Sequence, residues 1–378
     1  MIFSYAGLHC VVIKGYSKSA GYQPGMHFED SRFRNTWNCV YLDGSWRFVQ
    51  CNWGARHLVN AKDVPLAGGA KLASKSENLR YEYDDHYFMT DPEEFIFEFF
   101  PQQPEWQLLK RPLSLREFEL QPFVRSLFFR FGLTFADVDL KAVVEADKTG
   151  AATVAINMSP EAISSLIFHY NLRFYDSEEP EFNRICLKRF VMQSVVGQSV
   201  VFRVHTPTRG DFLLDIFANA ISAGEYLTGQ PMKFKSVCKL KIACDHLNVI
   251  MVPLPECASG EWGPAKGFRL FGLVPLTHED AIVNSPKDLQ IRFRMTRPLA
   301  EFVASLHKNN VDDKKLAKFV SHTVRGDQVV FSLTFPTDGQ YGLDLYTRDR
   351  SSYANANGHQ EAKQLLTHCC KYLINART

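Results

Sequence analysis

The stretch Asn35–Trp53, N-T-W-N-C-V-Y-L-D-G-S-W-R-F-V-Q-C-N-W, sets the expected fold of the N-terminal part of this chain of 378 residues. Two runs rich in valine, tyrosine, phenylalanine and tryptophan flank the dipeptide Asp43-Gly44. Asp-Gly accepts the two positive φ angles of a type I′ turn, so the pattern predicts a β-hairpin. Three tryptophans fall within the stretch, which indicates that the hairpin buries unusually large side chains.

The composition is that of a folded protein with mixed charges. Hydrophobic residues make up 46% and aromatic residues 13%, and the length allows two or three domains. The net charge of +2 comes from interspersed acids and bases, which gives no electrostatic reason to expect nucleic acid or an anionic membrane. Nine cysteines without a repeated short spacing favour a reducing, cytoplasmic setting. We expect no signal peptide and no membrane span.

A second segment and the hairpin together carry a family resemblance. The segment reads Ala6-Gly7-Leu8, Cys10 and Ile13-Lys14-Gly15-Tyr16-Ser17-Lys18, and the hairpin contributes Trp37, Asn38, Val40, Gly44, Trp46, Val49 and Trp53. At these positions the chain resembles the second half of a transglutaminase-like, papain-like cysteine-peptidase core, in particular that of the hillarin and kyphoscoliosis-peptidase family. The resemblance implies an α+β fold for this part of the chain.

The resemblance also implies a Cys-His-Asp site, yet two of its positions hold other residues. Asn35 stands at the general-base histidine and Gln50 at the orienting aspartate, fifteen residues apart as in the family. An asparagine amide cannot take a thiol proton near neutral pH, and glutamine carries no charge to stabilise an imidazolium. The nucleophilic cysteine is expected on a helix upstream of residues 6–18, before Met1. We therefore expect a degenerate triad and no catalytic residue in this chain.

Three cysteines near these positions are alternative nucleophiles. Cys51 directly follows the degenerate position 50, His57 lies six residues further on, and Cys10 and Cys39 fall on predicted strands. A reactive thiol needs an electropositive, partly open setting, whereas free cysteine is among the most buried residue types. We expect all three to be small apolar residues on buried strands.

Two further groups contain residue types that bind metals. They are Cys244-Asp-His246 with Cys257 nearby, and His368-Cys369-Cys370. Neither shows the paired short spacing of a zinc site, so no metal is predicted, and no motif indicates a cofactor. The segment Asp84-Asp85-His86 is expected to be a hydrated loop.

The second half of the chain contains a long internal repeat. Residues 201–217 realign on residues 330–346 at a spacing of 129, and residues 237–242 realign on 369–374 at a spacing of 132. A repeat of this length marks two copies of one domain, each ending in strand, turn, strand, long loop and strand. Tyr341 has the position of a tyrosine corner, whereas the first copy holds Phe212 there.

These patterns and the resemblance predict the fold and its division. We expect a partial transglutaminase-like α+β core over residues 1–104, followed by two all-β immunoglobulin-like sandwiches over residues 105–247 and 248–378. The family also carries such sandwiches after its core.

The resemblance implies a non-catalytic pseudoenzyme that acts as a cytoskeleton-associated, protein-binding scaffold in the cytoplasm. Exposed edge strands of the sandwiches offer a route, by pairing with a strand of the partner. One alternative is a transglutaminase-like cysteine peptidase whose catalytic cysteine lies in a missing N-terminal segment. Another treats residues 1–100 as a remnant that does not fold alone, since the absent helix leaves an apolar sheet face uncovered.

Overall fold

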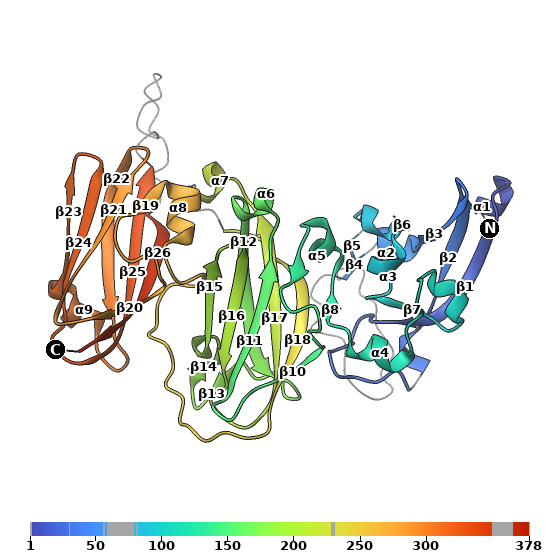
Figure 1. The fold of residues 1–378 in the computed structure, drawn as a ribbon, viewed down its shortest axis with the longest axis horizontal. Coiled ribbons are helices and arrows are strands. Elements are labelled where there is room, and N and C mark those ends of the chain that lie inside the picture. The colour runs from blue at the N-terminus through green and yellow to red at the C-terminus, as the bar shows by residue number, and fades with distance from the viewer. Residues whose placement is uncertain are drawn as a thin grey trace.

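The computed structural model describes residues 2–29, 31–55, 57–58, 79–80, 82–227, 231–349 and 366–377. They form three bodies in a row: an N-terminal five-stranded sheet and two β-sandwiches (Figure 1). Strands predominate, as the repeat and the composition predict. Within the described ranges, no helix has both the length and the apolar character that crossing a membrane requires.

The predicted hairpin forms, and its strands lie inside the N-terminal sheet. Strands β2 (Arg34–Leu42) and β3 (Ser45–Val49) pair antiparallel, and both turn residues have positive φ, 50° at Asp43 and 80° at Gly44. The type I′ turn is therefore confirmed. The strand order is β6-β3-β2-β1-β7, with antiparallel pairing throughout. The other strands of this sheet are β1 (Cys10–Ser17), β6 (Phe88–Thr90) and β7 (Phe99–Pro101).

Trp37 is the centre of the N-terminal core. It is 2% exposed, and its ring packs against Phe95 and Phe99 at centroid distances of 5.7 and 5.3 Å. The same indole leaves no room on the neighbouring strand, because a Cβ added at Gly15 would come within 2.5 Å of it. Only glycine fits that position. The predicted burial is confirmed for Trp37, whereas the other two hairpin tryptophans are half-buried.

Short helices flank the N-terminal sheet. They are α1 (Ile2–Tyr5), α2 (Cys51–Ala55), α3 (Pro92–Phe95), α4 (Leu115–Leu120) and the 3-10 turns η1 (Ser31–Phe33), η4 (Asp85–Tyr87) and η5 (Pro104–Gln107), beside the strand pair β4 (His57–Leu58) and β5 (Leu79–Arg80). Helix α3 begins at Pro92, whose fixed φ and missing N–H suit the first turn of a helix. Asp91 precedes it but does not cap it with its side chain, and pairs with Arg47 at 3.5 Å instead.

The two copies of the repeat fold into two sandwiches of the same topology. The first contains β8 (Phe123–Val124), β9 (Thr134–Phe135), β10 (Val143–Glu145), β11 (Ala151–Asn157), β12 (Leu166–Phe174), β15 (Val191–Val196), β16 (Ser199–His205), β17 (Gly210–Ala220) and β18 (Lys235–Cys244). The second contains β19 (Leu273–Pro275), β20 (Ile282–Ser285), β21 (Asp288–Met295), β22 (Leu299–His307), β23 (Val320–Arg325), β24 (Gln328–Thr334), β25 (Gly339–Asp349) and β26 (Thr367–Ala376).

The strand orders match sheet by sheet. One sheet runs β10-β18-β17-β12 in the first sandwich and β20-β26-β25-β22 in the second. The facing sheet runs β15-β16-β11-β9 in the first and β19-β21-β24-β23, the same order reversed, in the second. Strand β10 pairs parallel with β18 in the first sandwich, and β20 pairs parallel with β26 in the second. Strand β8 adds to the first sandwich beside β18. The predicted internal repeat is confirmed.

The remaining short elements connect these strands. They are α5 (Ser126–Arg130), α6 (Pro160–Ile163), β13 (Glu181–Phe182), β14 (Ile185–Cys186), η6 (Leu187–Phe190), α7 (Ala223–Leu227), α8 (Ala265–Phe271), α9 (Asp313–Leu316) and η7 (Ala317–Phe319). A glycine with positive φ follows the last turn of each of the helices α5 and α8, Gly132 at 60° and Gly272 at 69°. A left-handed glycine ends a helix without steric cost, so the repeated Phe-Gly-Leu sequence marks the same helix end in both copies.

The repeat extends to irregularities of the backbone. The pairing of β17 with β18 shifts between Ile216 and Phe217, and the pairing of β25 with β26 shifts between Leu345 and Tyr346. These bulges lie 129 residues apart, whereas the next strands, β18 and β26, align at a spacing of 132 residues. The three additional residues of the second copy therefore belong to the connection between these two strands.

The predicted tyrosine corner is present in the second sandwich. Tyr341 is fully buried, and its hydroxyl donates to the carbonyl oxygen of Thr337 at 2.8 Å. In the first sandwich Phe212 is equally buried, but its ring stacks on Phe174 at a centroid distance of 5.0 Å. The same corner is thus held by a hydrogen bond in one copy and by aromatic packing in the other.

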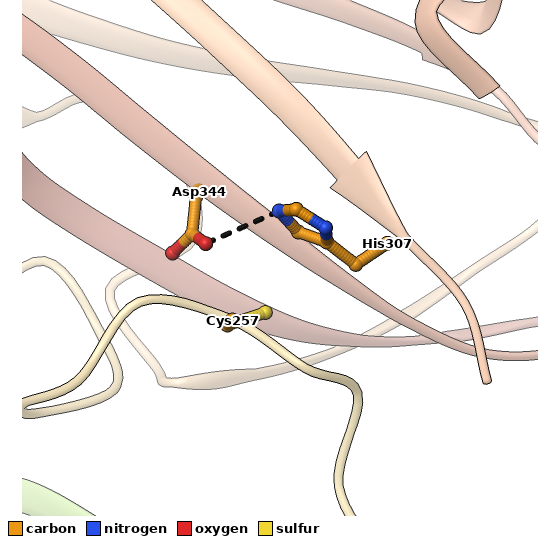
Figure 2. Close-up of side chains that lie close together, drawn as sticks. All are labelled: Cys257, His307 and Asp344. Carbon is orange, nitrogen blue, oxygen red and sulfur yellow. Dashed lines mark ion pairs between the residues drawn. The ribbon is translucent and has the colours of Figure 1, made fainter. Parts of the chain in front are cut away.

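Residues 253–264, called the strap, join the two sandwiches. The N–H of Trp262 donates to Gln193 of β15 in the first sandwich, and the N–H of Gly263 donates to Lys371 of β26 in the second, both at 2.7 Å. The strap also carries Cys257 over the second sandwich, beside His307 and Asp344 (Figure 2). Backbone hydrogen bonds to both bodies define the junction.

A buried ion pair locks the strap to helix α8. Both carboxylate oxygens of Glu261 accept hydrogen bonds from the guanidinium of Arg269, at 2.7 and 2.8 Å. The side chains are 2% and 6% exposed, and the same guanidinium donates to the carbonyls of Ile163 and Leu166 in the first sandwich. Arg269 therefore links helix α8 both to the strap and to the first sandwich.

Replacing Tyr341 by phenylalanine removes only the hydroxyl. We expect the second sandwich to lose about 1 kcal/mol of stability, because the Thr337 carbonyl loses its partner. Amide hydrogen exchange measures this locally: peptides from β24 to β26 should exchange about fivefold faster. Peptides from β15 to β18 serve as the internal control, and equal acceleration in both sandwiches would contradict the assignment.

Replacing Arg269 by methionine leaves Glu261 buried without its cation. Breaking a buried pair in this way typically costs about 3–5 kcal/mol, so the urea-unfolding midpoint should fall sharply. The double variant Arg269→Met/Glu261→Met is the matched control and should recover much of that loss, since neither charge remains. If the single and double variants were equally unstable, the pairing would not be what holds the junction.

Candidate functional site

Asn35 lies on β2 opposite Gly15 of β1 and is half-buried. Its side-chain amide nitrogen donates to the hydroxyl of Ser17 at 3.0 Å, and its side-chain oxygen accepts from the N–H of Thr36 at 2.8 Å. Both ends of the amide are therefore engaged within the sheet. An amide held in this way has no group with which to accept a thiol proton.

Gln50 follows strand β3 and is 3% exposed. Its side-chain nitrogen donates to the carbonyl of Thr36 at 3.3 Å, and its side-chain oxygen accepts from the N–H of Asn52 at 3.1 Å. The two amides thus bind the backbone of one residue: Asn35 takes the N–H of Thr36 and Gln50 takes its carbonyl. The arrangement satisfies buried polar groups and supplies neither a base nor a charge.

The three neighbouring cysteines differ in exposure. Cys39 is fully buried, and burial raises the pKa of its thiol to about 12. Cys10 lies on strand β1, as expected, but is half-buried. Cys51, at the start of α2, is exposed, so the expectation that all three are buried is wrong for this residue. The side chain of His57 lies outside the described part of the structure.

A buried lysine connects the resemblance-bearing segment to helix α4. The Lys18 ammonium donates to the carbonyl of Gln121 at 3.0 Å and lies 4.5 Å from the ring centroid of Phe118. Burial lowers the pKa of Lys18 to about 7. Through its contacts with a carbonyl and a ring, this lysine fixes the loop after β1 against residues 115–121.

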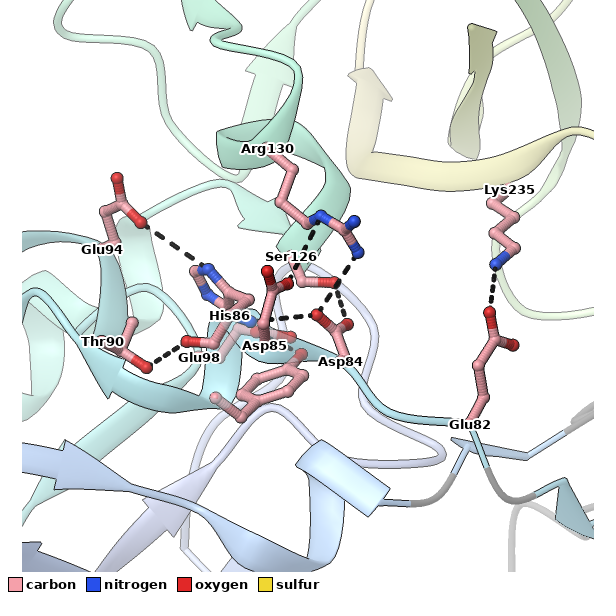
Figure 3. Close-up of polar contacts among 11 residues, drawn as sticks. Glu82, Asp84, Asp85, His86, Thr90, Glu94, Glu98, Ser126, Arg130 and Lys235 are labelled. Carbon is pink, nitrogen blue, oxygen red and sulfur yellow. Dashed lines mark hydrogen bonds and ion pairs between the residues drawn. The ribbon is translucent and has the colours of Figure 1, made fainter.

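The segment Asp84-Asp85-His86 is a contact to the first sandwich, and the expectation of a hydrated loop is wrong. Asp84 accepts a hydrogen bond of 2.6 Å from Ser126, and both aspartates lie 3.7 Å from the Arg130 guanidinium (Figure 3). The side chain of His86 is 5% exposed and stacks on Phe129 with ring planes 2° apart. Helix α5 supplies the polar and aromatic partners, so this segment joins two bodies.

The cysteines of Cys244-Asp-His246 and His368-Cys369-Cys370 contact backbone carbonyl groups. Cys369 and Cys370 are fully buried on β26, and their thiols donate to the carbonyls of Leu345 and Gly263. The thiol of Cys244 faces the carbonyl of His246 at 3.5 Å. Cys257 instead lies near two residues that are remote in sequence, and no spacing pattern signals that grouping.

Two consecutive sandwiches with one topology define a tandem immunoglobulin-like protein. The family of KY-like, immunoglobulin-like domains matches residues 115–255 and again residues 265–378. The chain belongs to this family. The double match falls on the two copies of the internal repeat.

Three relatives extend this assignment. Hillarin of Drosophila melanogaster is 63% identical and the Lim and transglutaminase domain protein ltd-1 of Caenorhabditis elegans 64% identical, each over 99% of this chain. Kyphoscoliosis peptidase of Homo sapiens is 28% identical over 93% of this chain. The matches cover 46%, 50% and 47% of these proteins, so the chain spans about half the length of the relatives it matches. The predicted resemblance is confirmed.

Thiol labelling of the native chain at neutral pH tests the cysteine geometry. We expect Cys51 to react at the rate of an ordinary exposed thiol and Cys39 to be protected, because the latter is buried and its pKa is raised. Mass spectrometry of the labelled peptides gives the rates, and Cys51→Ser is the control. A cysteine that reacts much faster than a free thiol would indicate a nucleophile and contradict the expected degenerate site.

Proposed function

We propose that this chain is a non-catalytic, protein-binding scaffold associated with the cytoskeleton in the cytoplasm. In this proposal the N-terminal sheet belongs to a transglutaminase-like pseudoenzyme core over residues 1–104. The immunoglobulin-like sandwiches over residues 105–247 and 248–378 provide the binding surfaces. No catalytic residue, cofactor or metal takes part in this function.

The observation that carries the proposal is the pair of amides around Thr36. Asn35 and Gln50 occupy the positions that the family resemblance gives to a histidine and an aspartate. The amide of Gln50 is engaged by backbone groups, and that of Asn35 by the N–H of Thr36 and the hydroxyl of Ser17. Each such bond stabilises a fold by about 1 kcal/mol but performs no proton transfer. The nematode relative is named a transglutaminase domain protein, and this name supports the assignment of the core.

The two sandwiches differ in one respect that bears on partner binding. In the first, edge strand β15 is covered, since Ser194 forms a bridge with Trp262 of the strap. Its counterpart in the second sandwich, β23, pairs only with β24 among the described strands. Five of the six residues of β23 are exposed. An open edge of this kind can take up an extended segment of another protein.

The hairpin geometry shows which groups of β23 face outward. A two-residue turn, Gly326-Asp327, joins β23 to β24, so Arg325 and Gln328 form a hydrogen-bonded pair. Hydrogen-bonded and open pairs then alternate along the strands. His322 and Val324 therefore direct their N–H and carbonyl groups to the open side.

Replacing Val324 by proline should block this edge and leave the sheet intact, because the lost N–H points outward. We expect the fraction of tagged full-length chain in the detergent-insoluble cytoskeleton to drop at least about fivefold, which corresponds to roughly 1 kcal/mol. Val324→Thr keeps the N–H and the shape, and should behave as wild type. Circular dichroism checks that both variants fold.

Equal partitioning of all three proteins would exclude β23 as the binding edge. A cytoskeletal fraction close to zero for the wild-type chain would exclude the scaffold function itself.

The names of the relatives favour a second candidate function, a transglutaminase-like cysteine peptidase whose nucleophile lies in a preceding segment. The two functions differ in a direct assay of peptide cleavage and peptide cross-linking. A scaffold shows neither, whether assayed alone or together with the preceding segment. Cleavage that disappears when a single cysteine is changed to alanine would establish the peptidase.

A further inference from the structure

The strap places a thiol over the second sandwich at a position prepared for it. Residues 342 and 344 of β25 lie on the face of the sheet turned away from the core, because their neighbours Leu343 and Leu345 belong to the core. A Cβ added at Gly342 would lie 2.2 Å from the sulfur of Cys257. The absence of a side chain at position 342 is therefore what admits the thiol.

A histidine and a carboxylate lie beside that thiol. His307, at the end of β22, pairs with Gly342 in the sheet register, and Asp344 lies two residues further along β25. The Nε2 atom of the histidine is 3.2 Å from Oδ2 of the aspartate. The sulfur, an imidazole nitrogen and a carboxylate oxygen all lie within 4.8 Å of one another (Figure 2).

The hydrogen bonds around His307 fix which ring nitrogen is available. Nδ1 lies 2.8 Å from a carboxylate oxygen of Asp313, an acceptor only, so Nδ1 carries a hydrogen and donates it. The Nε2 atom is buried and forms no hydrogen bond with well-aligned geometry. A lone pair on Nε2 would face the anionic oxygen of Asp344, an arrangement that requires a cation between them or a second proton on the ring.

Two hydrogen bonds hold the carboxylate of Asp344 in place beside His307. Its Oδ1 atom accepts from Nε2 of His368 at 2.8 Å, and its Oδ2 atom accepts from the backbone N–H of Ala258, also at 2.8 Å. His368 can donate from Nε2 because its Nδ1 accepts from the ammonium of Lys266 at 2.8 Å. The carboxylate is 1% exposed and held from two sides.

The first sandwich provides an internal comparison. At the positions equivalent to His307, Gly342 and Asp344, in the same register, it holds Arg173, Leu213 and Asp215. There the aspartate accepts from Ser236 at 2.7 Å and pairs with Lys239 at 3.2 Å. Only the aspartate is common to both copies, so the thiol, the imidazole and the space for them are particular to the second.

We propose that Cys257, His307 and Asp344 bind one Zn²⁺ ion, with a fourth position left for water. Sulfur, imidazole and carboxylate ligands together suit zinc better than Mg²⁺ or Ca²⁺, which prefer oxygen. Neighbouring nitrogen and oxygen ligands of a tetrahedral zinc ion lie roughly 3.3 Å apart, close to the separation of these two side chains. The hydrogen bond from Nδ1 to Asp313 is the outer-shell contact that metal-bound histidines make.

Zinc at this position would have a structural consequence. The strap is bonded to β15 of the first sandwich and to β25 and β26 of the second, so a metal held by Cys257, His307 and Asp344 would join it to β22 as well. The proposed zinc site does not depend on the scaffold function, and the test below contains no measure of partner binding.

The full chain, stripped of metal and kept reduced, is titrated with Zn²⁺ against a chromophoric chelator and with Co²⁺ as a spectroscopic probe. We expect one zinc per chain and a thiolate-to-cobalt charge-transfer band. Cys257→Ser and Asp344→Asn should each weaken zinc binding by more than about 100-fold, and Cys257→Ser should remove the band. Asp313→Asn, which changes only the outer contact, should weaken binding by about 10–100-fold.

Two variants are matched controls. Asp215→Asn alters the equivalent aspartate of the first sandwich, and Cys51→Ser removes an exposed thiol; both should bind zinc as the wild type does. Circular dichroism shows whether Cys257→Ser folds, and if it does not, the Asp313→Asn result decides, since that side chain is exposed. A wild-type chain that binds no zinc at micromolar concentration would mean that a second proton on His307 fills the position. Binding that survives both ligand substitutions would place the metal elsewhere, and either result overturns the proposal.

Discussion

The hydrogen bonds from Trp262 and Gly263 to two different sheets are the constraint on which the arrangement of the sandwiches depends. A sheet edge exposes unpaired backbone groups, and the strap satisfies those of β15 with residues that already lead into the next sandwich. The ion pair between Glu261 and Arg269 adds a buried anchor that is costly to break. One short segment therefore closes an edge, orients two bodies and carries a thiol over the second.

The same principle operates at the first junction with different residues. Trp106 opens the segment after the N-terminal sheet and packs against Trp46 of the hairpin, at a centroid distance of 5.1 Å. In the strap, Trp262 clusters with Met192 of the first sandwich and Leu373 of the second. Each connecting segment thus places a tryptophan against the body that precedes it. Large aromatic side chains at the start of a connection limit the freedom of the bodies on either side.

In the N-terminal sheet, the side chains at the candidate site serve the packing and hydrogen bonding of the fold. Trp37 and Gly15 still fit one another across two strands, and Asn35 and Gln50 satisfy the backbone of Thr36. The two sandwiches likewise agree in architecture and differ in the side chains of one outer face. Their strand order and bulges agree, yet the outer face of one holds Arg173 and Leu213 where the other holds His307 and Gly342. Core positions preserve the architecture, and the faces turned away from it are free to differ.

The sequence alone determined the features that depend on neighbouring residues or on regular repetition. Asp43-Gly44 defined the hairpin turn, and the spacing of 129 located equivalent strands in two copies of a sandwich. These features follow from local backbone preferences and from the alternation of buried and exposed side chains. The resemblance also pointed to positions 35 and 50, although not to their common contact with Thr36.

Only the tertiary structure decided what distant segments do to one another. It buried His86 against Phe129, covered β15 while leaving one side of β23 unpaired among the described strands, and brought Cys257 beside His307 and Asp344. None of these contacts has a signature in residue spacing. The register between strands, and the path of the strap across two sheets, set which side chains meet, and both result from the packing of the whole chain.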